Sequence, residues 1–71
     1  MNNRLKEYRE KAGLSQTELA GMAKMAAQNI SAIERGKLAP WPRARKALAE
    51  ALKVAEAELF REENRYGKDN S

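Results

Sequence analysis

The sequence contains neither cysteine nor histidine. Without them the chain can form no disulfide, bind no metal through thiolate or imidazole, and use no cysteine nucleophile or histidine-based triad. Its carboxylates, lysines and hydroxyls show no arrangement of nucleophile and base. The composition therefore argues against an enzyme and predicts neither a cofactor nor a metal site.

The chain also lacks a long apolar segment, and it is only 71 residues long. No stretch approaches the roughly 20 apolar residues that span a bilayer, and the charged start is unlike a secretion signal. We therefore expect a cytoplasmic protein that does not enter a membrane. Because a domain of this size buries only about 60% of its unfolded surface, its marginal stability favours a homodimer.

Positive charge is concentrated in the first two thirds of the chain. Residues 1–46 carry ten Lys or Arg and four Glu, a net charge of +6, whereas residues 47–71 carry four bases and six acids, a net charge of −2. A basic front and an acidic back suit a protein whose first part contacts a polyanion while the rest contacts protein. An ordinary solvated surface is the alternative explanation.

Apolar spacing and capping signals predict two short helices at the start of the chain. Apolar residues three and four positions apart favour a helix over residues 2–12, which Gly13 ends. Ser15 and Glu18 then form a capping box, in which each side chain accepts the other residue's backbone N–H. This box predicts a second helix over residues 16–23.

Three further helices are predicted in the rest of the chain. A third helix over residues 27–35 ends at Gly36, and Pro42 suits the first position of a fourth helix because its missing N–H would have no partner there. A fifth helix is expected over residues 56–64. The sequence thus predicts an all-α domain of five helices over residues 1–65, followed by a short flexible tail over residues 66–71.

Several short sequence patterns follow one another in a fixed order between Arg4 and Phe60. They are Arg9-Glu10-Lys11, Leu14-Ser15-Gln16, Glu18-Leu19-Ala20, Ile33-Glu34-Arg35-Gly36-Lys37, Pro40 and Leu48-Ala49-Glu50-Ala51-Leu52. In this order they resemble the Cro and phage-repressor type of helix-turn-helix protein over about four fifths of the chain. The resemblance implies a five-helix, lambda-repressor-like DNA-binding domain whose second and third helices form the reading motif.

The sequence departs from this family at four positions. Lys24 and Lys53 occupy positions where the family has a turn glycine, and a side chain in that left-handed conformation costs about 1 kcal/mol. Ala26 and Ala55 occupy positions where the family often has a Ser or Thr N-cap, whose loss costs about 1 kcal/mol. Lys24 is the departure that bears on the turn before the third helix.

The resemblance places the start of the third helix in the major groove of double-stranded DNA. Gln28 can pair with adenine N6 and N7, whereas an alanine can only contact a thymine methyl group or leave space for water. Ala27 and Ala32 are explained equally well as good helix formers. The expected base-reading residues are Ala27, Gln28, Ser31 and Ala32.

Further polar residues are candidates for contacts with the DNA backbone. Gln16 begins the second helix, where its side chain and the nearby backbone N–H groups can hold a phosphate. Three cations lie after the reading helix or at the start of the fourth, where they oppose the helix dipole, so a phosphate partner would explain them. Solvated surface is the alternative for the cations, Gln16 and Thr17, and Asn29 is alternatively a poor substitute for a cap. We favour the phosphate role only for Gln16. The candidates are Gln16, Thr17, Asn29, Lys37, Arg43 and Arg45.

Other assignments concern the scaffold. The resemblance pairs Arg9 with Glu34 in a salt bridge that ties the first helix to the end of the third. Trp41 lies between two prolines and is expected to pack at the core edge rather than against the DNA backbone. By their spacing, Leu19, Met22, Ile30 and Ile33 are predicted to be core residues.

These features predict a sequence-specific DNA-binding transcription regulator, a repressor that binds a palindromic operator as a homodimer. An antitoxin that represses its own operon is one alternative, although few residues after Asn64 remain to bind a partner. A helical protein-interaction module is another, but Gln16, Gln28 and the basic front argue against it. The dimer is expected to use an apolar patch of Leu59, Phe60 and Tyr66.

Overall fold

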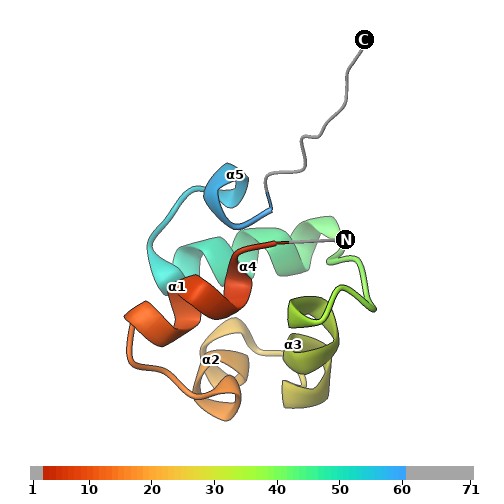
Figure 1. Ribbon diagram of the computed structural model, residues 1–71, viewed down its shortest axis with the longest axis horizontal. Helices are drawn as coiled ribbons and strands as arrows, with labels where there is room; N and C mark the ends of the chain where they lie inside the picture. The colour runs from red at the N-terminus through yellow and green to blue at the C-terminus, as the bar shows by residue number, and fades with distance from the viewer. Residues whose placement is uncertain (1–2, 61–71) are drawn as a thin grey trace, which may run out of the picture.

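The computed structural model describes residues 3–60, which form five helices and no strand (Figure 1). The helices are α1 (Leu5–Lys11), α2 (Gln16–Ala23), α3 (Ala27–Glu34), α4 (Pro42–Leu52) and α5 (Glu56–Leu59). This arrangement confirms the predicted all-α, five-helix fold. Residues 61–64 of the predicted fifth helix and the predicted tail, residues 66–71, lie outside the described part of the chain.

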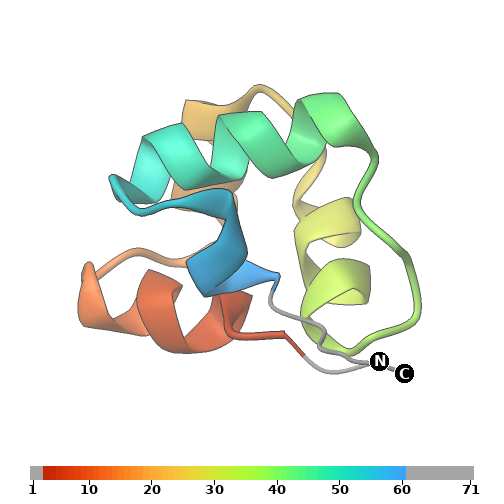
Figure 2. The same cartoon turned by 90° about the horizontal axis from the view of Figure 1, so that it is seen from above.

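The helices surround one small core. Helix α4 packs against both α2 and α5, and α3 packs against α2 and α1. In Figure 1, α5 lies above α4 and the α2–α3 pair lies below it, and Figure 2 shows α5 between α1 and α4. Every helix contributes at least one fully buried side chain to the core, which contains Leu5, Leu19, Ile30, Ile33, Leu48 and Leu59.

The first helix begins at Leu5, later than the sequence predicted. The preceding residues are held by other parts of the fold. Arg4 has non-helical backbone angles (φ −107°, ψ 18°), and its N–H donates to the Leu59 carbonyl at 2.9 Å. Asn3 accepts the Leu5 N–H through Oδ1 at 3.0 Å and donates from Nδ2 to the Ile33 carbonyl at 2.8 Å. These contacts fix the entry to α1 against α3 and α5.

Each of the first four helices is followed by one residue in the left-handed conformation. Its N–H bonds to a carbonyl three residues back, and the next N–H bonds to a carbonyl five residues back, the Schellman pattern. The φ angles confirm that two lysines stand in left-handed, glycine-like positions. The four residues are Gly13 (φ 75°), Lys24 (φ 58°), Gly36 (φ 75°) and Lys53 (φ 60°).

Met22 was predicted to pack in the core and Trp41 at its edge, and both side chains are exposed. Met22 is 53% exposed, because α2 buries the stripe of Leu19, Ala20 and Ala23, and a three-residue step from Leu19 places Met22 on the flank away from the other two. Trp41 is 41% exposed. Its prolines hold the backbone extended just before α4, so the indole extends beside the core rather than into it. The predicted core position was wrong for Met22.

The predicted dimer patch is also wrong for the residues that the structure describes. Leu59 and Phe60 are buried within the monomer's own core, where they close the end of the fold beside α1 and α4. They are therefore not free to cover a second copy, and Tyr66 lies outside the described residues. Within residues 3–60, no helix is long and apolar enough to cross a membrane.

Candidate nucleic-acid interface

The start of α2 is fixed by its capping box. The Ser15 hydroxyl accepts the Glu18 N–H at 3.0 Å, and Glu18 Oε1 accepts the Ser15 N–H at 2.8 Å. These two hydrogen bonds pair N–H groups at the helix start and fix the backbone there. Gln16, the first residue of α2, is half-buried, and Thr17 is exposed. The first turn of α2 thus presents polar groups beside the positive end of a helix dipole.

Three of the four predicted base readers lie on the face of α3 opposite its buried side. Ile30 and Ile33 are fully buried against the core. Gln28, Ser31 and Ala32 lie on the other side of the helix, where Gln28 is exposed, and Ala27 lies on the flank, half-buried and packed against the core. The helical spacing makes all four neighbours on the helix surface, in a row formed by Ala27, Gln28, Ser31 and Ala32.

A buried network ties the three N-terminal helices together around Glu34. Arg9 Nε lies 2.6 Å from Glu34 Oε2, and Arg9 Nη2 donates to Oε1 at 3.3 Å. Arg9 Nη1 also donates to the Leu14 carbonyl at 2.8 Å. The hydrogen bond to Glu34 raises the pKa of the Arg9 guanidinium above its ordinary value, so Arg9 stays charged. The pair that the resemblance implied is present in the structure.

Gln16 joins the same network. Its Nε2 donates to Glu34 Oε1 at 3.0 Å. An amide nitrogen carries two N–H groups, so this bond orients the side chain and leaves a second donor for another acceptor. The carboxylate at the end of α3 therefore sets the direction of the side chain at the start of α2.

The cations predicted to meet phosphate separate into two groups. Lys37 and Arg43 are exposed, after α3 and in the first turn of α4. Arg45 instead turns toward α5, where its Nε lies 3.6 Å from Glu56 Oε1 and its guanidinium lies 5.4 Å from the Phe60 ring centroid. No periodicity in the sequence indicates that tertiary contact, because Arg45 and Glu56 lie on different helices.

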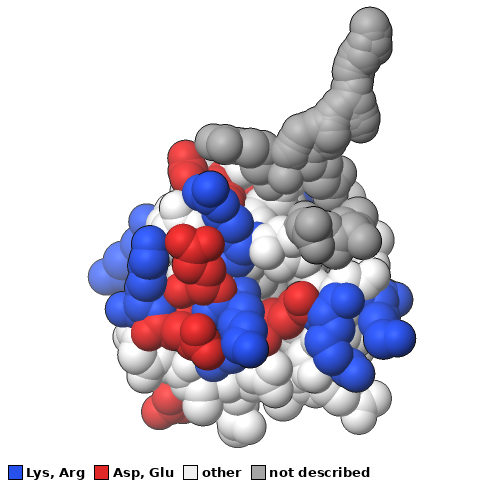
Figure 3. Space-filling model, in the orientation of Figure 1, with Lys and Arg blue, Asp and Glu red and all other residues white. Residues whose placement is uncertain are grey.

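Charge is distributed unevenly over the surface. In the view of Figure 3, one group of cations is interleaved with acids over α1, and a second group lies beside α3. The acids near α1 include Glu7, which lies 3.9 Å from Arg4 Nε and 3.3 Å from Lys11 Nζ. Cations on α1 are therefore partly neutralised, whereas the candidate phosphate contacts Lys37 and Arg43 form no ion pair within residues 3–60.

Comparison with known proteins agrees with this geometry. A family model described as a helix-turn-helix domain matches residues 3–61. The crystal structure of the restriction-modification controller protein C.AhdI from Aeromonas hydrophila is similar, with 35% sequence identity, a TM-score of 0.77, and coverage of 80% of this chain and 86% of that one. The SinR protein in its complex with SinI protein is also similar, with 32% identity and a TM-score of 0.78. That match covers 86% of this chain and 60% of SinR's.

No curated protein sequence matches the chain. The family match nevertheless spans most of the residues, and the two similar structures share its fold and are about one third identical to this chain in sequence. The chain therefore belongs to the helix-turn-helix family of transcription regulators of the Cro type.

Proposed function

We propose that the protein is a sequence-specific DNA-binding transcription regulator, a repressor that binds a palindromic operator as a homodimer. The observation that carries the proposal is the outer face of α3, a row of small and polar side chains directly after the capped helix α2. The similar protein C.AhdI is described as a restriction-modification controller, which is a regulatory role.

The proposed base contacts come from the start of α3. Gln28 is the exposed member of the reading face, and its amide can pair with adenine N6 and N7 in the major groove. Ser31, one turn further along, can hydrogen-bond to several base edges. Ala27 and Ala32 have short side chains, which let α3 approach closely and contact thymine methyl groups.

The proposed phosphate contacts surround this face. The second N–H of Gln16 and the Thr17 hydroxyl lie at the positive end of α2, which attracts a phosphate. Lys37, after the end of α3, and Arg43, in the first turn of α4, add exposed cations, and Asn29 can add a polar contact. Arg45 is left out of this set because it pairs with Glu56.

One reading helix contacts only one half-site of an operator, so we propose that two copies bind together as a homodimer. Two-fold related copies place two such helices in successive major grooves, about 34 to 36 Å apart. The same symmetry requires a palindromic operator. The dimer contact itself must use residues other than Leu59 and Phe60, which are buried in the monomer.

Selection of bound sites from random double-stranded DNA tests the proposal. We expect enrichment of two inverted half-sites whose centres are one turn of DNA apart. Sedimentation of the selected duplex with protein should give two chains per duplex, and a promoter carrying the site should lose activity when the protein is supplied. Recovery of no common sequence would overturn base reading, and one chain per duplex would overturn the dimer.

A further inference from the structure

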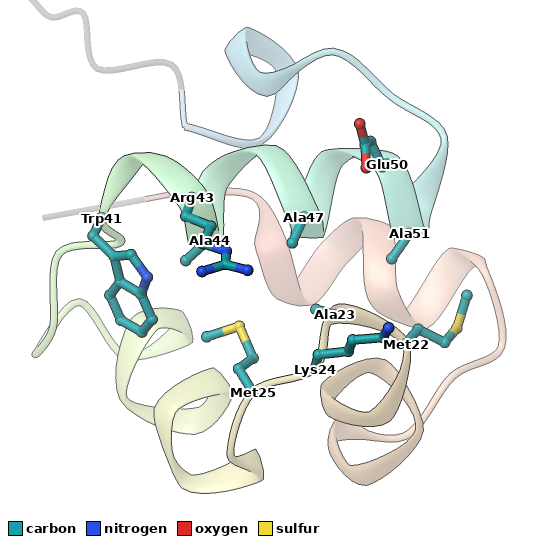
Figure 4. A pocket seen from close by; sticks show the side chains of 10 residues that line it. All are labelled: Met22, Ala23, Lys24, Met25, Trp41, Arg43, Ala44, Ala47, Glu50 and Ala51. Atoms are coloured by element: carbon teal, nitrogen blue, oxygen red, sulfur yellow. The ribbon is translucent and has the colours of Figure 1, made fainter.

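A half-open groove runs along α4 on the side of α2 (Figure 4). Its volume is about 660 Å³. The groove extends from the indole that precedes α4 to the end of α2, and the α2–α3 turn forms its lower edge. We name it the α2–α4 groove, and the side chains that matter here are Met22, Met25, Trp41, Arg43, Ala47 and Ala51.

The groove collects the apolar surface that the fold leaves uncovered. Within residues 3–60, the large apolar side chains that remain exposed are Met22 and Trp41, and both line this groove. Met25, half-buried, lies between them. Isolated exposed apolar side chains are common, but their gathering in one hollow marks an interaction surface.

The shape of the groove follows from small residues on α4. Ala47 and Ala51 lie one helical turn apart and line the hollow, so the side chains of α4 along this strip are short and leave space between α4 and the end of α2. The opposite wall contains two methionines, whose unbranched side chains adapt to the shape of a partner. Such a groove accepts large apolar side chains at helical spacing from a second chain.

The charges that face the groove favour a negatively charged second chain. In Figure 4 the Arg43 guanidinium points into the hollow between Trp41 and Ala47, and Lys24 lies near Met22 toward the other end. The one acidic residue of the lining, Glu50, directs its carboxylate away from the hollow. Cations thus face the groove, and carboxylates on an incoming segment would pair with them.

We propose that the α2–α4 groove docks an acidic amphipathic segment of a partner protein. Apolar side chains of the segment lie against the methionines and alanines, and its carboxylates meet Arg43 and Lys24. Small-molecule sites are usually enclosed, whereas this groove is open to solvent. A polypeptide segment lying along it therefore covers Met22 and Trp41 better than a small molecule does.

Docking of this segment would oppose DNA binding, and this part of the inference rests on the proposed function. Arg43 belongs to both surfaces, because it is also a proposed phosphate contact. A carboxylate bound to Arg43 removes that cation from the DNA backbone and places negative charge near phosphate. The partner segment is therefore an antagonist of the operator complex.

Selection from a library of random 16-residue peptides, displayed on phage and without DNA, tests the docking site. Peptides are selected on the wild-type protein and depleted on Met22→Glu, which adds a carboxylate to the groove at an exposed position. Ala57→Glu, the same charge on an exposed residue of α5 outside the groove, is the control. We expect peptides with apolar residues at helical spacing and more acids than bases. They should quench Trp41 fluorescence and bind Met22→Glu at least about tenfold more weakly than Ala57→Glu.

Three results would overturn the docking site: no enriched peptides, enriched peptides that are basic, or equal binding to the two variants. Wild-type self-association that Met22→Glu abolishes would assign the groove to a second copy instead. DNA binding that Met22→Glu weakens and Ala57→Glu does not would assign it to DNA.

The antagonist step has its own assay. The enriched peptide should displace the selected operator from the wild-type protein, and an unchanged operator complex would overturn the antagonism alone. Because peptide selection needs no DNA, its result stands whether or not the protein proves to bind an operator.

Discussion

Arg9 and Glu34 are 25 residues apart in the sequence, and Arg9 Nε lies 2.6 Å from Glu34 Oε2 in the folded chain. The two side chains are only 10% and 3% exposed. The contact joins α1 to the end of α3, and the shared carboxylate also holds Gln16. A scaffold interaction thus extends to the edge of the proposed DNA surface.

Breaking this pair should be strongly destabilising. Arg9→Ala leaves the Glu34 carboxylate buried without its cation, and Glu34→Ala leaves the Arg9 guanidinium without its anion, so each should lower the free energy of unfolding by about 3 kcal/mol. The double variant should lose less than the sum of the two. Urea unfolding of all four proteins measures the coupling.

The exposed pair Arg4 and Glu7 is the control for that cycle. Its atoms are 3.9 Å apart and its side chains are 50% and 49% exposed, so its coupling should be below about 0.5 kcal/mol. Equal coupling energies in the two cycles would contradict the role assigned to burial.

Lys24→Gly should stabilise the fold by about 1 kcal/mol. Residue 24 has φ 58°, a conformation in which a Cβ is strained and glycine is not. Lys46→Gly, an exposed site inside α4, should instead destabilise by about 1 kcal/mol, because glycine disfavours a regular helix. Thermal melts of both variants check the signs, and a lowered melting temperature for Lys24→Gly would show that the strain is offset by another contact.

Gln28→Ala should relax the sequence preference of the protein. If Gln28 reads one base pair, its loss should cost about 1 to 3 kcal/mol on the selected operator and little on a scrambled duplex. Titrations of both duplexes, monitored by fluorescence anisotropy, give the two affinities. Equal weakening on both would reassign base reading to Ser31, to the alanines or to DNA shape.

Arg43→Ala should weaken binding to every duplex alike. One fewer phosphate contact releases one fewer counterion, so the slope of log K against log salt should fall by about 1. Arg45→Ala is the matched control, because it removes the same charge from the same helix while Arg45 is paired with Glu56. A salt series on the selected operator distinguishes them, and equal changes in slope would return Arg45 to the phosphate set.

Most of the fold could be predicted because its signals are local. The capping box at Ser15, the glycines that end helices and the proline at the start of α4 each act within one helical turn, so sequence spacing suffices to place them. Lys24 and Lys53 were recognised as glycine-like positions only through the family resemblance, because nothing in a lysine itself indicates a left-handed backbone.

The start of α1 and the fate of particular side chains were not predictable in this way. Arg4 lies outside α1, and its N–H donates to the Leu59 carbonyl. The Arg45 side chain lies against α5 because Glu56 and Phe60 are beside it. Each depends on residues from a distant part of the chain. Periodicity predicted that Met22 lies in the core, because it is three residues from Leu19. Which flank of Leu19 is buried, however, depends on where α4 packs against α2.

The sequence by itself determined the five helices and the separation of a basic front from an acidic back, whereas the left-handed turn between α2 and α3 was indicated only by the family resemblance. Those features depend on backbone conformation and composition, which neighbouring residues set. Only the tertiary structure decided that Glu34 orients Gln16, that Leu59 and Phe60 are covered, and that Met22 and Trp41 share a groove. Burial and charge pairing are properties of surfaces that meet in space, so they follow from helix packing rather than from the order of residues along the chain.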